Sequence, residues 1–513
     1  MLTTVYSAGI EGIDGYIVKV ECSVVKRFPS YNVVGLPDNA VKESKERIRS
    51  SVEHSGFRFP DDEILINLAP ADKKKTGTAF DLPILVGILT SGGLIRAELE
   101  GSCFIGELSL SGEIRSVKGI LCMCIAARNS GIKRVFVPKD NALEASVVDG
   151  IEVYGVSCVK ELVGHITCEK RIEPTVFKRD EFLAGTYSSV PDFSDVKGQS
   201  FVKRALEIAA AGGHNILMIG PPGTGKSMLA KRLPGILPPL SFEEALETTK
   251  IYSSVGLIPP GKAIVTKRPF RSPHHTMSPV SLTGGGSVIK PGEVSLANNG
   301  VLFLDELPEF GKSVTETLRQ PIEDRRITIT RASGHLTFPS KFMLVCAMNP
   351  CKCGYYGHPK IKCTCRPDEI RKYMSRISGP LLDRIDIQVE VPALDFEDMA
   401  RKGTPSESSL SVRQRVEAAR AISEKRFRSE GKSGGCNAEL DTVQIQKYCA
   451  LDEEGKQIMR MAYDKFGISA RGYDRILRLA RTIADLAGRE SICASDIAEA
   501  VQYRTLDRKY KEI

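Results

Sequence analysis

Residues 220–227 read Gly-Pro-Pro-Gly-Thr-Gly-Lys-Ser, a complete phosphate-binding loop. The apolar run 215–219 before it predicts a short strand, and the run 228–233 after it predicts a helix, which is the context that the motif requires. Glycine lets the backbone turn its N–H groups toward phosphate oxygens. We expect Lys226 to reach the β- and γ-phosphates and Ser227 to bind Mg²⁺. The sequence therefore predicts an ATP-type site formed by Gly220, Pro221, Pro222, Gly223, Thr224, Gly225, Lys226 and Ser227.

The size and composition of the chain narrow its class. Its 513 residues exceed what one hydrophobic core organises, so we expect about two to four domains. The net charge of +8 is by itself weak evidence for nucleic acid. No stretch has the pattern of a secretory signal or a membrane span, and the 14 cysteines are typical of reduced thiols or metal ligands. We therefore expect a cytoplasmic protein with no membrane partner.

Four segments differ in pattern along the chain. Residues 1–168 alternate short strand-like and helical runs, which predicts a domain that contains both strands and helices. Residues 169–192 are polar and lack periodicity, as expected of a linker. Residues 193–395 alternate buried strands with helices, which predicts an α/β domain with a parallel sheet. Residues 396–513 are helical and rich in Arg, Ala and Glu.

Two more apolar runs end in polar side chains that suit ATP hydrolysis. The strand 301–304 runs into Asp305 and Glu306, and we expect Asp305 near Mg²⁺ and Glu306 to orient and deprotonate the attacking water. The strand 342–348 runs into Asn349, which can hydrogen-bond the γ-phosphate or the water. The alternative for Asn349 is an ordinary turn residue.

Arginines later in the chain can complete such a site. Arg384, in Leu-Leu-Asp-Arg, is our candidate for the arginine supplied to the γ-phosphate of a neighbouring subunit, with Arg376 as its rival. The alternative is an ion pair inside its own subunit. Arg471 opens a basic helix and is expected to reach the nucleotide from a helical lid, with Arg475 as the second choice.

The order of these motifs resembles that of AAA+ ATPases. The stretches 268–275 (Arg-Pro-Phe-Arg-Ser-Pro-His-His) and 290–310 more specifically resemble the magnesium-chelatase-like branch, and the whole chain is similar to its YifB/ComM group. The resemblance implies an AAA+ P-loop core with a C-terminal helical lid, ATP and Mg²⁺ as cofactors, and a ring, usually a hexamer, that hydrolyses ATP between subunits. It also implies a motor on single-stranded or branched DNA, similar to a branch-migration helicase of natural transformation and homologous recombination.

The N-terminal domain resembles a different enzyme. Residues 106–115 and 126–138 are similar to segments of the Lon protease domain, which implies a ribosomal S5 domain 2-like fold. A Lon-type site needs a serine nucleophile and a lysine base. By this match, the serine position falls at Thr78 or Ala79 and the lysine position at Leu121. Leucine accepts no proton, so we expect no peptidase activity and a role in assembly or substrate engagement.

A cysteine-rich loop follows Asn349. Cys351, Cys353, Cys363 and Cys365 form two Cys-x-Cys pairs within residues 351–365. Four thiols can hold Zn²⁺ tetrahedrally, and reduced loop thiols are the alternative. The same loop carries lysines and tyrosines, a mixture that suits phosphate contact and base stacking.

Residues 325–338 read as two strands around a Gly turn. In related rings, a hairpin at this place points into the pore, and Arg331 near its tip is our first choice for tracking a DNA backbone. Our candidate DNA contacts are Arg326, Arg331, Lys352, Lys360 and Lys362, with a solvated basic face as the alternative.

The leading hypothesis is therefore a ring-shaped ATP-driven DNA motor. The alternative is a magnesium-chelatase-like ATPase subunit that remodels a protein partner. For His274 and His275 we favour a structural role, because no acidic or thiol partner is close in sequence.

Overall fold

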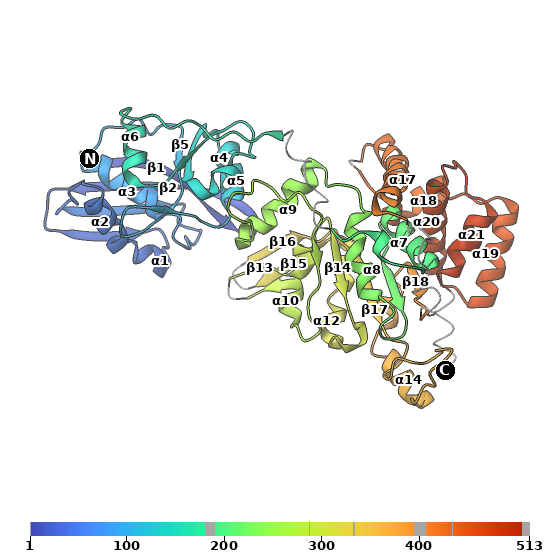
Figure 1. Ribbon diagram of the computed structural model, residues 1–513. Coiled ribbons are helices and arrows are strands. Elements are labelled where there is room, and N and C mark those ends of the chain that lie inside the picture. Colours follow the sequence, from blue (N-terminus) through green and yellow to red (C-terminus); the bar gives the residue numbers. More distant parts are fainter. Residues whose placement is uncertain are drawn as a thin grey trace. The chain divides into compact units, whose positions relative to one another are not determined.

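The computed structural model describes residues 2–179, 190–286, 288–331, 334–393, 407–432 and 434–504 (Figure 1). The chain forms two compact units. The first unit contains residues 1–184 and 241–266, and the second contains residues 185–240 and 267–513. Segment 241–266 thus belongs to the first unit, although its sequence lies within the range expected for the ATPase core. Among the described residues, none of the helices combines the length and apolar character needed to cross a bilayer.

The first unit is built on a mixed sheet of seven strands in the order β3-β4-β2-β1-β5-β8-β9. Strands β1, β2 and β4 pair antiparallel, whereas β5, β8 and β9 pair parallel. The strands of this unit, including the small β6–β7 pair, are β1 (Leu2–Glu11), β2 (Asp14–Val25), β3 (Ser30–Val34), β4 (Glu63–Ala69), β5 (Ser102–Phe104), β6 (Glu107–Leu108), β7 (Ile114–Arg115), β8 (Arg134–Pro138) and β9 (Glu152–Val156).

The helices of the first unit cover this sheet. They are α1 (Asn39–Lys42), α2 (Ser44–His54), α3 (Asp81–Ser91), α4 (Ile120–Asn129), α5 (Ala142–Ala145), α6 (Val159–Ile166) and α9 (Phe242–Val255). Helix α3 is apolar on nearly every side and buried, and a Cβ added at its Gly87 would lie 2.4 Å from the Cys22 sulfur of β2. Helix α9, from the later segment, packs on α4: the Gly119 N–H donates to the Ser253 carbonyl at 2.8 Å.

The second unit contains a parallel sheet of five strands in the order β11-β14-β17-β10-β18. These strands are β10 (Ile216–Ile219), β11 (Phe270–Arg271), β14 (Val301–Leu304), β17 (Met343–Met348) and β18 (Ile387–Glu390). Three of them, β10, β14 and β17, are buried along their whole length, as expected for a sheet that helices cover on both faces. Because the strands are parallel, their carboxyl ends lie at one edge of the sheet.

Helices surround this sheet and extend beyond it. They are α7 (Ser200–Gly212), α8 (Lys226–Arg232), α10 (Pro279–Thr283), α11 (Glu293–Leu296), α12 (Lys312–Glu316), α13 (Arg319–Asp324), α14 (Pro367–Met374), α15 (Gly379–Leu382), α17 (Ser409–Ser429), α18 (Thr442–Tyr448), α19 (Glu453–Phe466), α20 (Ala470–Leu486) and α21 (Ala494–Gln502). The C-terminal helices share one hydrophobic core with α7 and the sheet. They also reach the amino ends of the strands, because the Gln388 N–H of β18 donates to the Tyr503 carbonyl at 2.9 Å.

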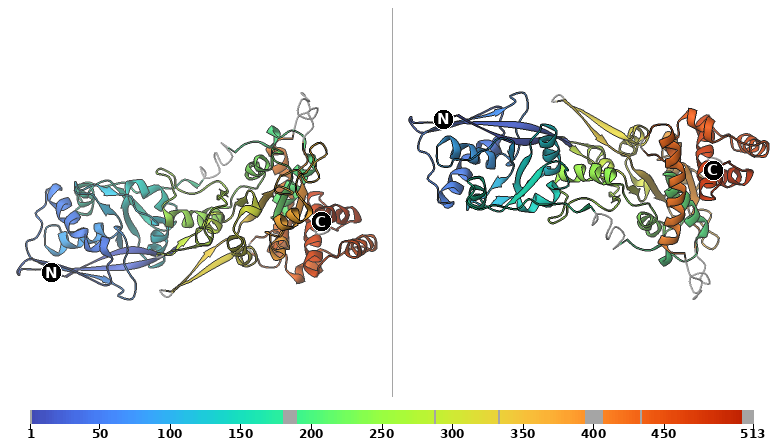
Figure 2. Two further views of the ribbon diagram at one scale, coloured as in Figure 1. Left: turned by 90° about the horizontal axis from the view of Figure 1, so that it is seen from below. Right: turned by 90° about the horizontal axis from the view of Figure 1, so that it is seen from above.

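A β-hairpin leaves the body of the second unit. Its strands β15 (Arg326–Arg331) and β16 (Gly334–Pro339) pair antiparallel, with Arg331 opposite Gly334. Both views in Figure 2 show this hairpin as a narrow yellow ribbon that projects from its unit. Strands β12 (Gly284–Gly285) and β13 (Lys290–Pro291) form a second, much shorter pair.

Candidate nucleotide-binding site

The phosphate loop connects β10 to α8 at the carboxyl edge of the five-stranded sheet. Gly223 and Gly225 have φ angles of 79° and 84°, a left-handed conformation that suits glycine. Gly220 has a different reason to be glycine, since a Cβ there would lie 2.3 Å from the Val391 carbonyl oxygen. The Gln199 side-chain amide donates to the Thr224 carbonyl at 2.7 Å and fixes the loop from α7. The loop is therefore held in a defined shape by its own backbone.

Lys226 extends back into this loop and is only 8% exposed. Its ammonium donates to the carbonyls of Gly220 at 2.7 Å and Pro221 at 2.8 Å, and to Asn349 Oδ1 at 3.2 Å. Burial holds the pKa of Lys226 below its usual value, and the nearby carboxylates of Asp305 and Glu306 only partly offset this. The result is a positive charge inside the loop, where the phosphates of a nucleotide bind in proteins with this motif.

Strand register brings Asn349 to Lys226. Strands β10 and β17 are parallel neighbours with Ile219 opposite Met348, so the residues that follow them, Gly220 and Asn349, lie side by side. The Gly220 N–H donates to the Met348 carbonyl at 3.2 Å and extends the ladder into the loop. Asn349 is thus placed where it can contact the same phosphate as Lys226.

Asp305 and Ser227 form an oxygen-rich pair beside the lysine. Asp305 directly follows β14, and its Oδ2 accepts a hydrogen bond of 2.6 Å from the Ser227 hydroxyl. A carboxylate and a hydroxyl are oxygen ligands of the kind that Mg²⁺ prefers, together with water and nucleotide phosphates. The residues present therefore fit Mg²⁺ in complex with a nucleoside triphosphate.

Glu306 has an unusual backbone. Its φ of 53° places a non-glycine residue in the left-handed region, which is uncommon for such residues. The Glu306 N–H donates to Asp305 Oδ1 at 3.0 Å, and the Glu306 side chain is 57% exposed. This turn directs the two neighbouring carboxylates to different places, with Asp305 toward Ser227 and Glu306 toward solvent at the same edge.

His275 lies beside Glu306, a position that sequence reasoning missed. Its Nδ1 is 3.8 Å from Glu306 Oε2, and its ring is 4.2 Å from that of His274. The sequence alone favours a structural role for both histidines, because no acidic or thiol partner is near them in sequence. The stretch 268–275 that carried the family resemblance was the available signal, since it marked these histidines as family-specific.

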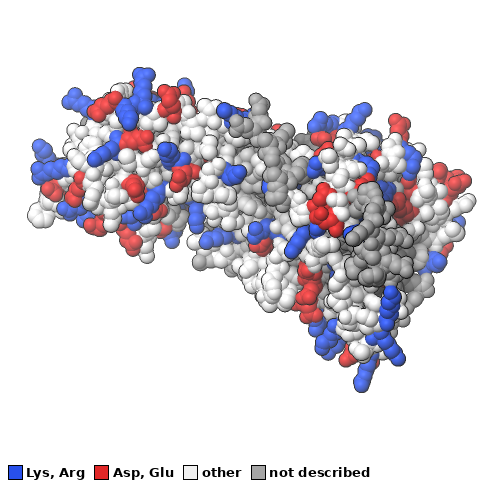
Figure 3. Space-filling view, viewed as in Figure 1, with Lys and Arg blue, Asp and Glu red and all other residues white. Residues whose placement is uncertain are grey.

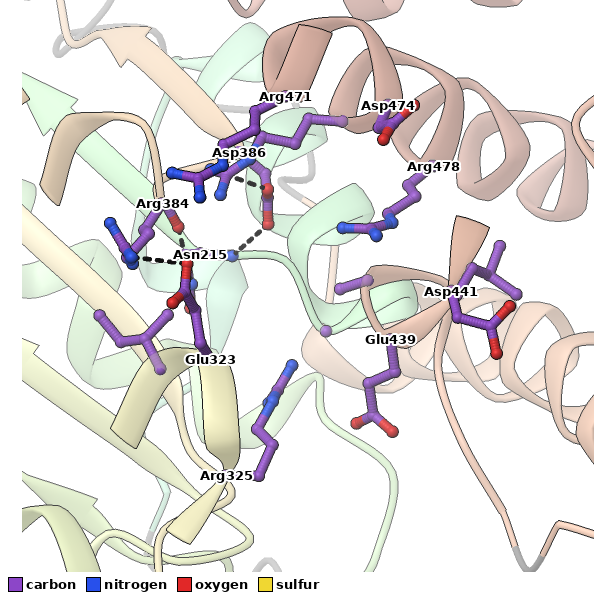
Figure 4. A pocket seen from close by; sticks show the side chains of 15 residues that line it. Asn215, Glu323, Arg325, Arg384, Asp386, Glu439, Asp441, Arg471, Asp474 and Arg478 are labelled. Atoms are coloured by element: carbon purple, nitrogen blue, oxygen red, sulfur yellow. Dashed lines mark hydrogen bonds and ion pairs between the residues drawn. The ribbon is translucent and has the colours of Figure 1, made fainter. Parts of the chain in front are cut away.

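The candidate arginines lie at the opposite edge of the sheet. Arg384 and Arg471 line one pocket with Asn215, which precedes β10, and Asp386, which precedes β18 (Figure 4). Arg384 is 9% exposed; it pairs with Glu323 at 2.6 Å and donates to the Pro380 carbonyl at 2.7 Å. Arg471 was expected to reach the nucleotide from a lid. The structure instead places it with Arg384, beyond the amino ends of the strands.

Asp386 anchors this second edge. Burial would raise the pKa of Asp386, but contact with His214 and the charge of Arg475 outweigh burial and hold the pKa well below its usual range. His214 Nδ1 lies 3.4 Å from Asp386, and Arg475 lies 3.5 Å from it. Arg475, the second choice for the lid arginine, is thus engaged with Asp386. Arg376, the rival of Arg384, pairs with Glu309 at 2.9 Å.

The remaining candidate residues lie elsewhere. Arg326 is exposed at the base of the β15–β16 hairpin, and Lys352, Lys360 and Lys362 are exposed on the cysteine loop. The side chain of Arg331 lies outside the described residues. The four cysteines of the loop converge, with their sulfurs within 4.8 Å of one another. In the first unit, Leu121 is buried in α4, and the Thr78 hydroxyl contacts the Glu107 carboxylate.

Comparison with known families covers most of the chain. A model described as "Subunit ChlI of Mg-chelatase" matches residues 20–141, one described as "Magnesium chelatase, subunit ChlI" matches residues 192–399, and one described as "Magnesium chelatase, subunit ChlI C-terminal" matches residues 406–504. Together with the phosphate loop and the parallel sheet, these matches define a magnesium-chelatase-like AAA+ protein.

Individual relatives narrow the class. The competence protein ComM of Haemophilus influenzae is 40% identical over 514 residues, which cover 100% of this chain and 99% of that protein. The uncharacterized protein YifB of Escherichia coli is 40% identical over 508 residues, which cover 99% and 98%. The chain belongs to the YifB/ComM family. The Lon protease of Acinetobacter baumannii is 24% identical over 165 residues, 29% of this chain and 20% of that protein, so the likeness to Lon is partial.

Replacing Lys226 tests the phosphate loop. We expect Lys226→Ala to weaken ATP binding by about 10- to 100-fold, because it removes a buried charge-assisted donor. Titration with a fluorescent ATP analogue measures the change. Lys231→Ala is the matched control, since Lys231 is exposed on the same helix and should leave affinity unaltered. Equal affinity of the Lys226→Ala and wild-type proteins would contradict this assignment.

Replacing Glu306 separates binding from hydrolysis. We expect Glu306→Gln to keep ATP affinity while hydrolysis falls by about 10²- to 10⁴-fold, because the amide cannot take a proton from water. Single-turnover hydrolysis and nucleotide retention measure the two effects. Glu309→Gln, three residues further along, is the control. Rapid turnover by Glu306→Gln would show that another group is the base.

Proposed function

We propose that this chain hydrolyses ATP in a ring of identical subunits and uses the energy to move on DNA. The observation that carries the proposal is the division of the ATP machinery between two edges of one sheet. Lys226, Ser227, Asp305 and Asn349 gather at the carboxyl edge, whereas Arg384 and Arg471 line a pocket at the amino edge.

This division favours a site shared by two subunits. A buried sheet separates the arginine pocket from the phosphate loop of the same chain, so the arginines are not placed to reach a nucleotide there. Head-to-tail contacts between identical chains form a ring when the rotation between subunits closes, and they bring different surfaces of neighbouring subunits together. In such a ring, the amino edge of one subunit faces the phosphate loop of the next. Arg384 and Arg471 would then both serve the neighbour's nucleotide.

The pocket combines five arginines with five acidic residues, so an arginine can bind a phosphate there where its acidic partner moves away. Arginines from three places in the chain, Arg325, Arg384 and the α20 group of Arg471, Arg475 and Arg478, line it together. The acidic residues in its wall include Glu323, which holds Arg384 and is about half exposed. Glu323 can separate from Arg384 at a small cost in free energy, because a half-exposed carboxylate is already hydrated. A phosphate chain is a suitable replacement partner for Arg384.

Two surface features support DNA as the substrate. The projecting β15–β16 hairpin begins at exposed Arg326. A second basic surface, which we call the basic tip, lies around the cysteine loop and the start of α14, where Figure 3 shows Lys and Arg side chains. Its exposed basic members are Lys352, Lys360, Lys362, Arg366, Arg371 and Lys372, and the acidic residues Asp368 and Glu369 are exposed beside them. Contacts from such side chains to phosphates are independent of sequence, as a translocating motor requires.

The relatives supply the biological setting. The full-length similarity to a competence protein supports a role in processing DNA taken up during natural transformation, where a branch-migration helicase would act on single-stranded or branched DNA. We propose that this processing takes place in the cytoplasm.

A mixing experiment tests the shared site. We expect Arg384→Ala to lower ATP hydrolysis on the order of 10³-fold and Lys226→Ala to abolish it. Mixing the two inactive proteins should restore measurable hydrolysis, because an intact phosphate loop can then meet an intact arginine from its neighbour. In the control mixture, the Arg376→Ala variant takes the place of Arg384→Ala. The Arg376→Ala variant should hydrolyse ATP by itself, without mixing. A mixture as inactive as its components would mean that Arg384 does not act between subunits.

DNA dependence distinguishes the two candidate functions. We expect forked or single-stranded DNA to stimulate ATP hydrolysis, and Arg331→Ala to weaken DNA binding and lower its salt slope by about 1 without changing basal hydrolysis. Arg428→Ala, an exposed arginine on α17, is the control. Hydrolysis that is indifferent to DNA would instead favour a magnesium-chelatase-like subunit that remodels a protein partner.

A further inference from the structure

The cysteine loop brings four sulfur atoms to one point. All four lie within 4.8 Å of one another, and three separations are 3.3 Å for Cys351–Cys353, 3.5 Å for Cys353–Cys363 and 3.7 Å for Cys351–Cys363. A disulfide joins only two sulfurs, at about 2.0 Å. Four thiolates around Zn²⁺, each about 2.3 Å from the ion, would be separated by about 3.8 Å. The three separations, 3.3 to 3.7 Å, lie just below this edge length, and the fourth sulfur is close enough to complete the set.

The surroundings of the sulfurs suit the same ion. The backbone of Tyr355 and Thr364 hydrogen-bonds to the Cys353 sulfur, and such second contacts orient ligands in metal sites. His358 is occupied otherwise, because its Nδ1 accepts the N–H groups of Lys360 and Ile361. Four thiolates around one Zn²⁺ carry a net charge of −2, and the lysines of the basic tip offset it. An all-thiolate tetrahedral set selects zinc over magnesium or calcium.

The loop also touches the nucleotide site. Cys351 is buried two residues after Asn349, whose side chain contacts Lys226. A Cβ added at Gly354 would lie 2.6 Å from Pro222 Cδ, so the backbone at Gly354 rests directly on the phosphate loop. The Gly354 N–H donates to the Cys351 carbonyl at 3.0 Å, which closes a turn between the first two cysteines. The first cysteine pair thus lies immediately before the contact with the phosphate loop.

The second cysteine pair connects to another part of the site. Cys365 is followed by Arg366, where α14 begins, and Arg376 just beyond this helix pairs with Glu309 after the Asp305–Glu306 turn. An ion bound by both cysteine pairs would connect the segment that contacts the phosphate loop to the start of α14. Without it, the 15-residue loop has few apolar side chains to keep its shape, and metal binding supplies folding energy in such small elements.

We propose that Cys351, Cys353, Cys363 and Cys365 bind one Zn²⁺, and that this ion holds the Cys351–Gly354 turn against Pro222 so that ATP binds tightly. Binding exchanges four thiol protons for the ion, with no change of oxidation state. The second half of this proposal rests on the proposed ATP binding, whereas the first half does not.

Metal analysis of the purified wild-type chain tests the first half. We expect one zinc per chain by inductively coupled plasma mass spectrometry, and its loss in Cys363→Ala/Cys365→Ala. Cys365→His should retain zinc, because imidazole can replace a thiolate ligand. Cys168→Ser is the control, since this exposed cysteine lies in the first unit. Wild-type protein without zinc, or with iron in its place, would overturn the zinc assignment.

Titration with a fluorescent ATP analogue tests the second half. We expect the zinc-free double variant to bind at least about 10-fold more weakly, with Cys365→His and Cys168→Ser close to wild type; a tenfold change is about 1.4 kcal/mol. Unchanged affinity after zinc loss would overturn the coupling. If the double variant does not fold, wild-type protein stripped of zinc by a chelator replaces it; weaker ATP binding by that form supports the coupling, and unchanged binding opposes it. Wild-type protein that holds zinc but binds no ATP would contradict the proposed function and leave the zinc site intact.

Discussion

The nucleotide site depends on one buried positive charge and the groups that stabilise it. Lys226 is enclosed by its own loop, and transfer of an ammonium out of water is costly unless hydrogen bonds and opposite charges replace the water. Two loop carbonyls, the Asn349 amide oxygen and the carboxylates of Asp305 and Glu306 provide these interactions. Three strands must end together for these groups to converge, and the parallel sheet achieves this. The site therefore forms only where these three strands end at the same edge, and the parallel sheet determines that place.

The amino edge of the same sheet is organised by a buried negative charge. Asp386 is held ionised by His214 and Arg475, and it fixes the start of β10 through the Asn215 backbone at 3.2 Å. The C-terminal helices pack here, with the Thr482 hydroxyl 2.8 Å from His214. An arginine on these helices is consequently positioned by the amino edge. This explains why Arg471 lies beside Arg384, at the far end of the strands from the phosphate loop.

The sequence was most informative where a motif and a strand end coincide. Lys226, Asp305 and Asn349 could be grouped in advance because each follows an apolar run and parallel strands share an edge, and the resemblance to the YifB/ComM family was confirmed by the comparisons. Arg471 could not be placed, because its motif describes a helix start and not the packing of that helix. The contact of His275 with Glu306 and the contact of Gly354 with Pro222 also could not be predicted from the sequence. They join residues 31 and 132 positions apart (306 − 275 and 354 − 222) through tertiary structure alone.

Segment 241–266 gives the chain an unusual connectivity. The polypeptide passes between the two units three times, at residues 184, 240 and 266, because α9 leaves the second unit to pack on α4 of the first. A protease that cuts only between residues 179 and 190 would sever one of these passages and leave α9 anchored in the first unit by its packing. The N-terminal piece would then stay associated after cleavage, in contrast to domains joined by a single tether.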